Sequence, residues 1–171
     1  VVKGEGDFTL KRVAEEGLSH EIPNIYYKTN GGIVKSRAQG IIAEDLDALP
    51  YPAYELLDLK KYTQPGVLSR KQPAGFLETS RGCYARCVFC NKGIFGFKVR
   101  QKSPMRVVDE MERMLDLGFR EIHIIDDIFT ADKKRVFDIC EEILRRRLKF
   151  PWHPHSGVRA DSVSPGLLKM M

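Results

Sequence analysis

The chain has 171 residues, of which 43% are hydrophobic and 30% charged, and its formal net charge is +5 at pH 7. This composition is typical of a globular protein and excludes an intrinsically disordered chain. No apolar run approaches the roughly 18 residues of a membrane-spanning helix, and no stripe of basic and aromatic residues favours nucleic-acid binding.

The N-terminal part of the chain predicts a small α+β module. Residues 8–16 have the spacing of a short helix that ends at Gly17. Residues 24–28 and 33–35 alternate like strands. The Asn30-Gly31 step between them is a strong hairpin signal, because both turn residues need positive φ. This module is expected to carry no catalytic site.

A linker is expected at residues 44–72, where the pattern is irregular and Pro50 and Pro52 interrupt it. A helical turn is predicted at residues 54–59, and Tyr51 and Tyr54 are interpreted as surface packing residues.

The rest of the chain predicts strands and helices in alternation. Strands are expected at 75–80, 121–125 and 152–158, and helices after the N-caps Ser103, Asp132 and Ser164. This order predicts a parallel sheet with functional groups on the loops that follow the strands. The run Arg145-Arg146-Arg147 is interpreted as a solvated helix end, where cations complement the helix dipole.

The most informative motif is the group Cys83, Cys87 and Cys90, spaced Cys-x3-Cys-x2-Cys. An odd number of thiols leaves one unpaired in any disulfide scheme, and soft thiolates select zinc, copper or iron–sulfur centres. No fourth cysteine is nearby, so two interpretations stand. One is a four-iron cluster with an open iron; the other is a structural zinc site completed by a histidine. His153 and His155 alternate on an expected strand and point to one side, where they would contact a substrate, complete such a zinc site or simply be hydrogen-bonded core histidines.

The cysteine spacing, with Phe89 before the third cysteine, resembles the radical S-adenosylmethionine (SAM) enzymes. The resemblance implies a [4Fe–4S] cluster ligated by the three cysteines, with SAM on the open iron. It also implies an external electron donor and reductive cleavage of SAM to a 5′-deoxyadenosyl radical. Phe89 would pack near the adenine.

Three further motifs are similar to the branch of this family that carries a cobalamin-binding domain. They are Gly4-Glu5-Gly6-Asp7, Leu49-Pro50-Tyr51-Pro52 and Asp126-Asp127-Ile128-Phe129. By this resemblance, residues 1–72 follow a cobalamin-binding domain outside the chain. The resemblance also implies that residues 73–171 form the first three βα units of a partial (β/α)6 TIM-like barrel. The fold class expected is therefore α/β, in a fragment of a longer protein.

The resemblance also implies contacts to SAM. Asp126 and Asp127 would receive the SAM amino group, and the alternative is that they cap a helix or a loop. Arg159 would pair with the SAM carboxylate, in an Arg-x-Asp motif with Asp161, and the alternative is a salt bridge between these two residues.

The function expected from the resemblance is methyl transfer to an unactivated carbon of a small-molecule or lipid-like substrate, with cyclisation and methylthiolation as related reactions. A cytoplasmic location is expected, because clustered thiols suit a reducing compartment. The edge of the sheet after the third strand predicts dimerisation of the fragment. The competing interpretation is a zinc-binding structural module with no catalytic activity.

Overall fold

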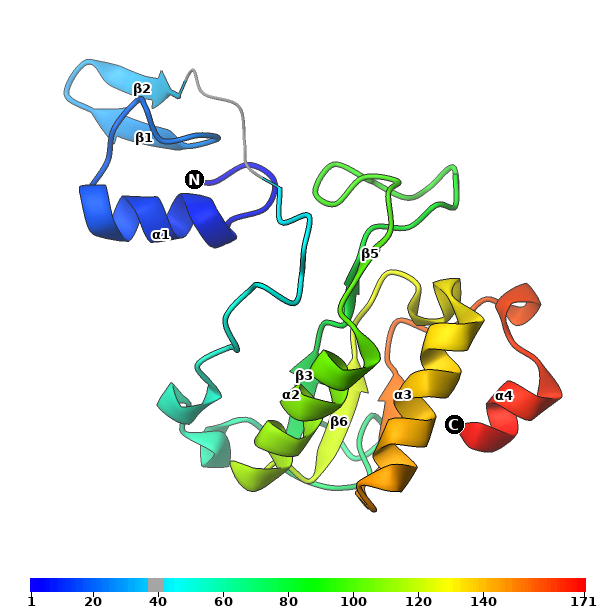
Figure 1. Cartoon of the computed structure of the whole chain (residues 1–171). Helices are drawn as coiled ribbons and strands as arrows, with labels where there is room; N and C mark the ends of the chain where they lie inside the picture. The colour runs from blue at the N-terminus through cyan, green and yellow to red at the C-terminus, as the bar shows by residue number, and fades with distance from the viewer. Residues whose placement is uncertain (37–41) are drawn as a thin grey trace. The chain divides into compact units, whose positions relative to one another are not determined.

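The structure is a computed structural model that describes residues 1–36 and 42–171 (Figure 1). It divides into two compact units, Val1–Glu44 with Tyr84–Lys98, and Asp45–Cys83 with Val99–Met171. The domain boundary expected between residues 72 and 73 stays a prediction. In the structure, residues 45–72 pack with the second unit.

The first unit contains the predicted helix and hairpin. Helix α1 spans Asp7–Glu16, and strands β1 (Tyr26–Thr29) and β2 (Gly32–Lys35) pair antiparallel with Thr29 opposite Gly32. The apolar side chains of α1 are not its buried ones, since Leu10 is 58% exposed and Thr9 is the buried residue of this helix.

The second unit is built on a three-stranded parallel sheet. Its strand order is β3 (Ala74–Leu77), β6 (Glu121–Ile124) and β7 (Trp152–Pro154). The helices are α2 (Pro104–Asp116), α3 (Lys133–Arg145) and α4 (Pro165–Met170), and Figure 1 shows α2 and α3 side by side. This confirms the predicted α/β class and parallel sheet.

All three predicted N-caps are present. The Ser103 hydroxyl accepts a hydrogen bond from the Arg106 amide, the Asp132 carboxylate from the Arg135 amide, and the Ser164 hydroxyl from the Leu167 amide. Each side chain satisfies an amide that has no partner within the helix, which explains why the starts of these helices are readable from sequence.

The sequence prediction was wrong about two strands. The predicted strand 75–80 ends at Leu77, and the short strand β4 (Ser80–Arg81) pairs antiparallel with β5 (Arg100–Gln101), which was not predicted. The predicted strand 152–158 ends at Pro154 and is followed by a turn.

Residues 1–36 and 42–171 contain four short 3-10 helices, two of them in the linker. They are η1 (Tyr54–Leu56), η2 (Leu59–Lys61), η3 (Phe129–Ala131) and η4 (Ala160–Ser162).

The core lies between one face of the parallel sheet and helices α2 and α3. Leu77, Ile122 and Ile124 are fully buried there. A Cβ added to Gly75 would lie 2.3 Å from the Met114 Cε atom, so this strand position faces the helices at a distance that only glycine allows. The residues next to these in each strand, such as Phe76 and His123, therefore face the other side of the sheet.

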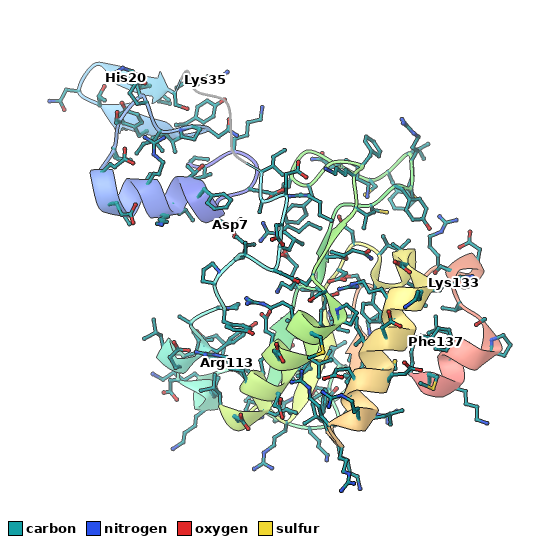
Figure 2. All side chains as sticks on the ribbon, viewed as in Figure 1. Asp7, His20, Lys35, Arg113, Lys133 and Phe137 are labelled. Carbon is teal, nitrogen blue, oxygen red and sulfur yellow. The ribbon has the colours of Figure 1, made fainter. Side chains whose placement is uncertain are left out.

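The linker packs against this unit more closely than predicted. The Tyr54 hydroxyl donates to the Phe76 carbonyl at 2.8 Å, and its ring meets Phe119 edge to face at 5.5 Å. The Arg106 guanidinium lies 3.5 Å from the centre of the Tyr51 ring. Arg113, labelled in Figure 2, donates to Glu55 at 3.2 Å. Tyr54 is partly buried by these contacts, so its packing goes beyond the simple surface packing expected for it.

Within the described residues, no helix combines the length and the apolar character that a membrane span requires.

Candidate functional site

The cysteine loop begins and ends in a short antiparallel stem. Ser80 pairs with Gln101 and Arg81 with Arg100, so the chain leaves β4, makes the loop and returns in β5 (Figure 1). Cys83 follows β4 by two residues and is 6% exposed. The stem thus fixes the backbone next to the first cysteine.

Buried polar groups hold this stem on the sheet. The Asp126 carboxylate accepts hydrogen bonds from the Thr79 amide and the Ser80 hydroxyl, both at 2.6 Å. The Arg135 guanidinium donates to the carbonyls of Lys102 at 2.7 Å and Thr79 at 2.9 Å. Burial lowers the pKa of Arg135, although Asp126 opposes this by favouring the charged guanidinium. Both ends of the cysteine loop are therefore tied to residues of the βα unit.

The three cysteines suit a metal–sulfur centre. All are free thiols, with Cys83 buried in the second unit and Cys87 and Cys90 exposed in the first. The Cys90 amide donates to the Cys87 carbonyl at 3.1 Å, which forms a turn between these two cysteines. Three unpaired soft donors within eight residues fit a [4Fe–4S] cluster that leaves one iron open.

The loop around these thiols exposes apolar side chains. Phe89 is 88% exposed, so it is not a core aromatic of the described structure. The Arg86 guanidinium lies 4.8 Å from the centre of the Phe97 ring, in the same loop. The loop thus presents apolar surface beside its two exposed thiols.

Asp126 and Asp127 follow the end of β6 but have different surroundings. Asp126 is 2% exposed and its carboxylate is used by the stem, whereas Asp127 is exposed. In the same motif, Phe129 is 1% exposed and packs edge to face on Trp152, with ring centres 5.8 Å apart. Of the two aspartates, Asp127 is the one whose side chain is accessible.

Arg159 and Asp161 follow the end of β7. The Arg159 guanidinium donates to both Asp161 oxygens, at 3.0 and 2.6 Å, which is the salt bridge that the sequence left open as an alternative. This hydrogen-bonded partner lowers the pKa of Asp161. Lys133, at the start of α3 in Figure 2, donates to the Asp161 carbonyl at 3.2 Å. A role toward SAM stays a prediction for both residues of the motif.

The sheet face opposite the helices carries a histidine cluster that the sequence did not predict as a group. It contains His123 on β6 and His153 and His155 at β7, beside Glu121. Burial alone would raise the pKa of Glu121, but hydrogen bonds from the Lys71 amide, His123 and the Arg70 amide lower it. Burial and the neighbouring His123 lower the pKa of His153. The sequence shows that Glu121 and His123, two positions apart on one strand, lie on the same face. That His153 and His155 join them follows only from the register of β6 with β7.

No family model matches the chain, but individual relatives do. It is 36% identical over 164 residues to an uncharacterised methyltransferase of Pyrococcus horikoshii, covering 92% of this chain and 34% of the relative. It is 34% identical over 147 residues to the cytidylyl-2-hydroxyethylphosphonate methyltransferase of Streptomyces wedmorensis. This match covers 80% of this chain and 26% of the relative.

Solved structures agree with these relatives. The cobalamin-dependent SAM radical enzyme OxsB, with aqua-cobalamin and SAM bound, superposes with a TM-score of 0.71 at 28% identity, over 98% of this chain and 25% of OxsB. The chain is a homologue of cobalamin-dependent radical SAM enzymes. The radical SAM methyltransferase TsrM from Kitasatospora setae has the same fold, with a TM-score of 0.59 at 23% identity over 85% of this chain and 29% of TsrM.

These relatives confirm the family resemblance and favour it over the zinc-module interpretation. The chain spans 34% of the Pyrococcus horikoshii relative and 25% of OxsB. The comparisons therefore concern one part of a radical SAM enzyme.

Proposed function

We propose that this chain is the cluster-binding and SAM-binding part of a cobalamin-dependent radical SAM methyltransferase. The observation that supports this most directly is the set of three free thiols on a loop whose stem is anchored to a parallel βα sheet. When bound there, a [4Fe–4S] cluster supplies the one-electron reduction that SAM cleavage requires, while the protein supplies binding and orientation.

Within this proposal, the chain's own residues have separate roles. Cys83, Cys87 and Cys90 bind the cluster through thiolate sulfur. Asp126 positions the loop through Thr79 and Ser80, because its oxygens already accept hydrogen bonds from them.

Three accessible residues bind SAM in this proposal. Asp127 accepts hydrogen bonds from the SAM amino group, and the neighbouring buried Asp126 adds negative charge to this part of the site. Arg159, oriented by Asp161, pairs with the SAM carboxylate, and the exposed Phe89 ring packs near the adenine. The support for these roles is the position of the aspartates and of Arg159 after the ends of parallel strands, where this class of sheet places functional groups.

The longer protein expected from the relatives adds the remaining parts. We propose that its barrel has six βα units, of which this chain contributes three, and that a separate domain binds cobalamin. Its substrate is a small or lipid-like molecule, and an external protein donates the electron. A cytoplasmic location is proposed, because cluster ligands stay reduced there. The fragment is proposed to dimerise through the β7 edge of its sheet.

Metal analysis tests the cluster directly. After anaerobic reconstitution, we expect about four irons and matching sulfide per chain, as for a single four-iron cluster. We expect this iron to be lost in Cys87→Ala and kept in Cys140→Ala, because Cys140 is a buried core thiol whose pKa burial raises to about 11. Added SAM should change the electron paramagnetic resonance spectrum of the reduced cluster. Zinc in place of iron, or equal iron in both variants, would contradict the proposal.

Radical cleavage of SAM is tested in a protein of the relatives' length that contains this sequence. Under anaerobic, reducing conditions with cobalamin present, it should convert SAM to 5′-deoxyadenosine. An iron-loaded protein with no SAM turnover would exclude the enzymatic function while leaving the cluster assignment intact.

A further inference from the structure

The histidine cluster lies on the sheet face that points away from the helices. Phe76, His123 and His153 are register partners on the three neighbouring parallel strands, so their side chains share one face. Gly75, one position earlier, faces the helices, which assigns the histidines to the other side. His123 is nevertheless 0% exposed.

The three histidines are arranged for a common ligand. One ring nitrogen from each of His123, His153 and His155 can be chosen so that all three lie within 4.8 Å of one another. The ring centres of His123 and His153 are 4.2 Å apart, and those of His123 and His155 are 5.3 Å apart. A metal held at about 2.0–2.1 Å from each nitrogen would draw these atoms closer together.

A buried carboxylate sets the orientation of the innermost ring. One oxygen of Glu121 lies 3.0 Å from His123 Nε2, while the other accepts the Arg70 and Lys71 amides at 2.7 and 2.8 Å. A His123 tautomer that donates through Nε2 leaves a lone pair on Nδ1. This Nδ1 atom is buried and has no hydrogen-bond partner in the described part of the chain.

Buried polar atoms are nearly always paired, so an unpaired ring nitrogen amid other imidazoles indicates an additional ligand. A histidine that binds metal through one nitrogen and donates the other to a carboxylate is the usual second-shell arrangement of metal sites. Glu121 and His123 have this arrangement.

The cluster also has an access route. A pocket of about 450 Å³ is lined by residues 66–70 together with Glu121, His153 and His155. An ion and a further exogenous ligand can enter by this pocket. Three histidines with one position open to a pocket is the ligand pattern of zinc sites that bind water or substrate.

We propose that His123, His153 and His155 bind one divalent transition-metal ion of the zinc class, with Glu121 as the carboxylate that orients His123. The site contains no cysteine, so it is separate from the cluster site and from the three-cysteine zinc site considered from sequence. It does not depend on the proposed radical function.

The first test removes the thiolates, which also bind zinc. In a variant with Cys83→Ser, Cys87→Ser and Cys90→Ser together, competition with a chromophoric chelator should show one Zn²⁺ bound per chain. Adding His155→Asn should lower the affinity by more than the roughly 10–100-fold typical of losing a second-shell partner. His155 is exposed, so its replacement should leave the fold intact, as circular dichroism will check.

The matched control is His20→Asn, at an exposed histidine of the first unit that is labelled in Figure 2. It should bind zinc like its parent. Equal affinity in the His155 and His20 variants, or no stoichiometric zinc in the parent, would overturn the proposal.

The second test keeps the thiols. In the wild-type chain loaded with its iron–sulfur cluster, zinc K-edge X-ray absorption should show nitrogen ligands at about 2.0–2.1 Å. A shell of sulfur at about 2.3 Å would place the zinc on cysteine and refute the histidine site. This readout is independent of catalysis and of the folding of the triple variant.

Discussion

Asp126 and Asp127 are neighbours in sequence but have opposite environments. Asp126 is 2% exposed and accepts hydrogen bonds from the Thr79 amide, the Thr79 hydroxyl and the Ser80 hydroxyl. Asp127 is exposed. The structure therefore gives Asp126 a stabilising role and leaves the Asp127 side chain accessible, as its proposed binding role requires.

We predict that Asp126→Asn destabilises the chain by about 1.5–3 kcal/mol, the usual contribution of a hydrogen bond to a charged group. The amide nitrogen cannot accept the two hydroxyl protons, and Arg135 loses a nearby negative charge. The free energy of unfolding in urea measures this. Asp127→Asn is the matched control and should stay within about 0.5 kcal/mol of the wild type; equal effects would contradict the separation of roles.

Residues that act through local spacing were predictable at this scale. The three cysteines lie within eight positions, so their shared role needs no knowledge of the fold. His123 was not recognised, because its partners His153 and His155 lie about 30 residues away and meet it only through the register of β6 with β7. The hydrogen bonds of Asp126 were missed for the same reason.

At the scale of elements, Arg146 connects α2 to α3. Its guanidinium donates to Asp109 and Glu112 on α2 and to Glu142 on α3, at 2.6, 2.7 and 2.6 Å. The interpretation of this arginine run as a simple solvated helix end was wrong for Arg146, whose side chain is 14% exposed. The carboxylates around it offset much of the local positive charge.

This bridge predicts an acid-sensitive contribution to stability. Hydrogen bonds from Arg145 and Arg146 lower the pKa of Glu142 from 4.5 to about 2. Because the folded-state pKa is depressed, the stabilisation is fully present above about pH 4.5 and is lost as the pH falls toward 2.

Unfolding of the wild type and of Glu142→Gln should be compared from pH 7 to pH 2. The wild type should be more stable by a constant margin near neutral pH, and the margin should shrink below about pH 4.5. A margin that persists at pH 2 would show that the effect of Glu142 is packing and not charge.

Elements with their own sequence signals were predicted well. The caps and periodicity of α2 and α3 are local, and the hairpin was predicted at the correct place. The turn prediction itself was wrong, because neither Asn30 nor Gly31 has positive φ, and the residue with positive φ is Gly32. Strands β4 and β5 have two residues each, too few for any alternation to be read, and they pair across about 20 residues. Their pairing depends on tertiary contacts to Thr79 and Lys102.

At the scale of the whole molecule, β7 lies at one edge of the three-stranded sheet. An edge strand presents unpaired backbone groups that another chain can use, although its three residues and Pro154 limit the length of such pairing. We predict a weak dimer, seen as a sedimentation coefficient that rises with protein concentration. A concentration-independent monomer would contradict pairing through this edge.

The β4–β5 stem has a consequence for how this enzyme family can vary. The stem, Asp126 and Arg135 hold both ends of the cysteine loop through hydrogen bonds within the second unit. Closing a flexible loop costs only about 0.6 kcal/mol more for each doubling of its length. The segment between the stem strands can therefore differ in length and sequence among relatives at little cost to the stability of the parallel sheet.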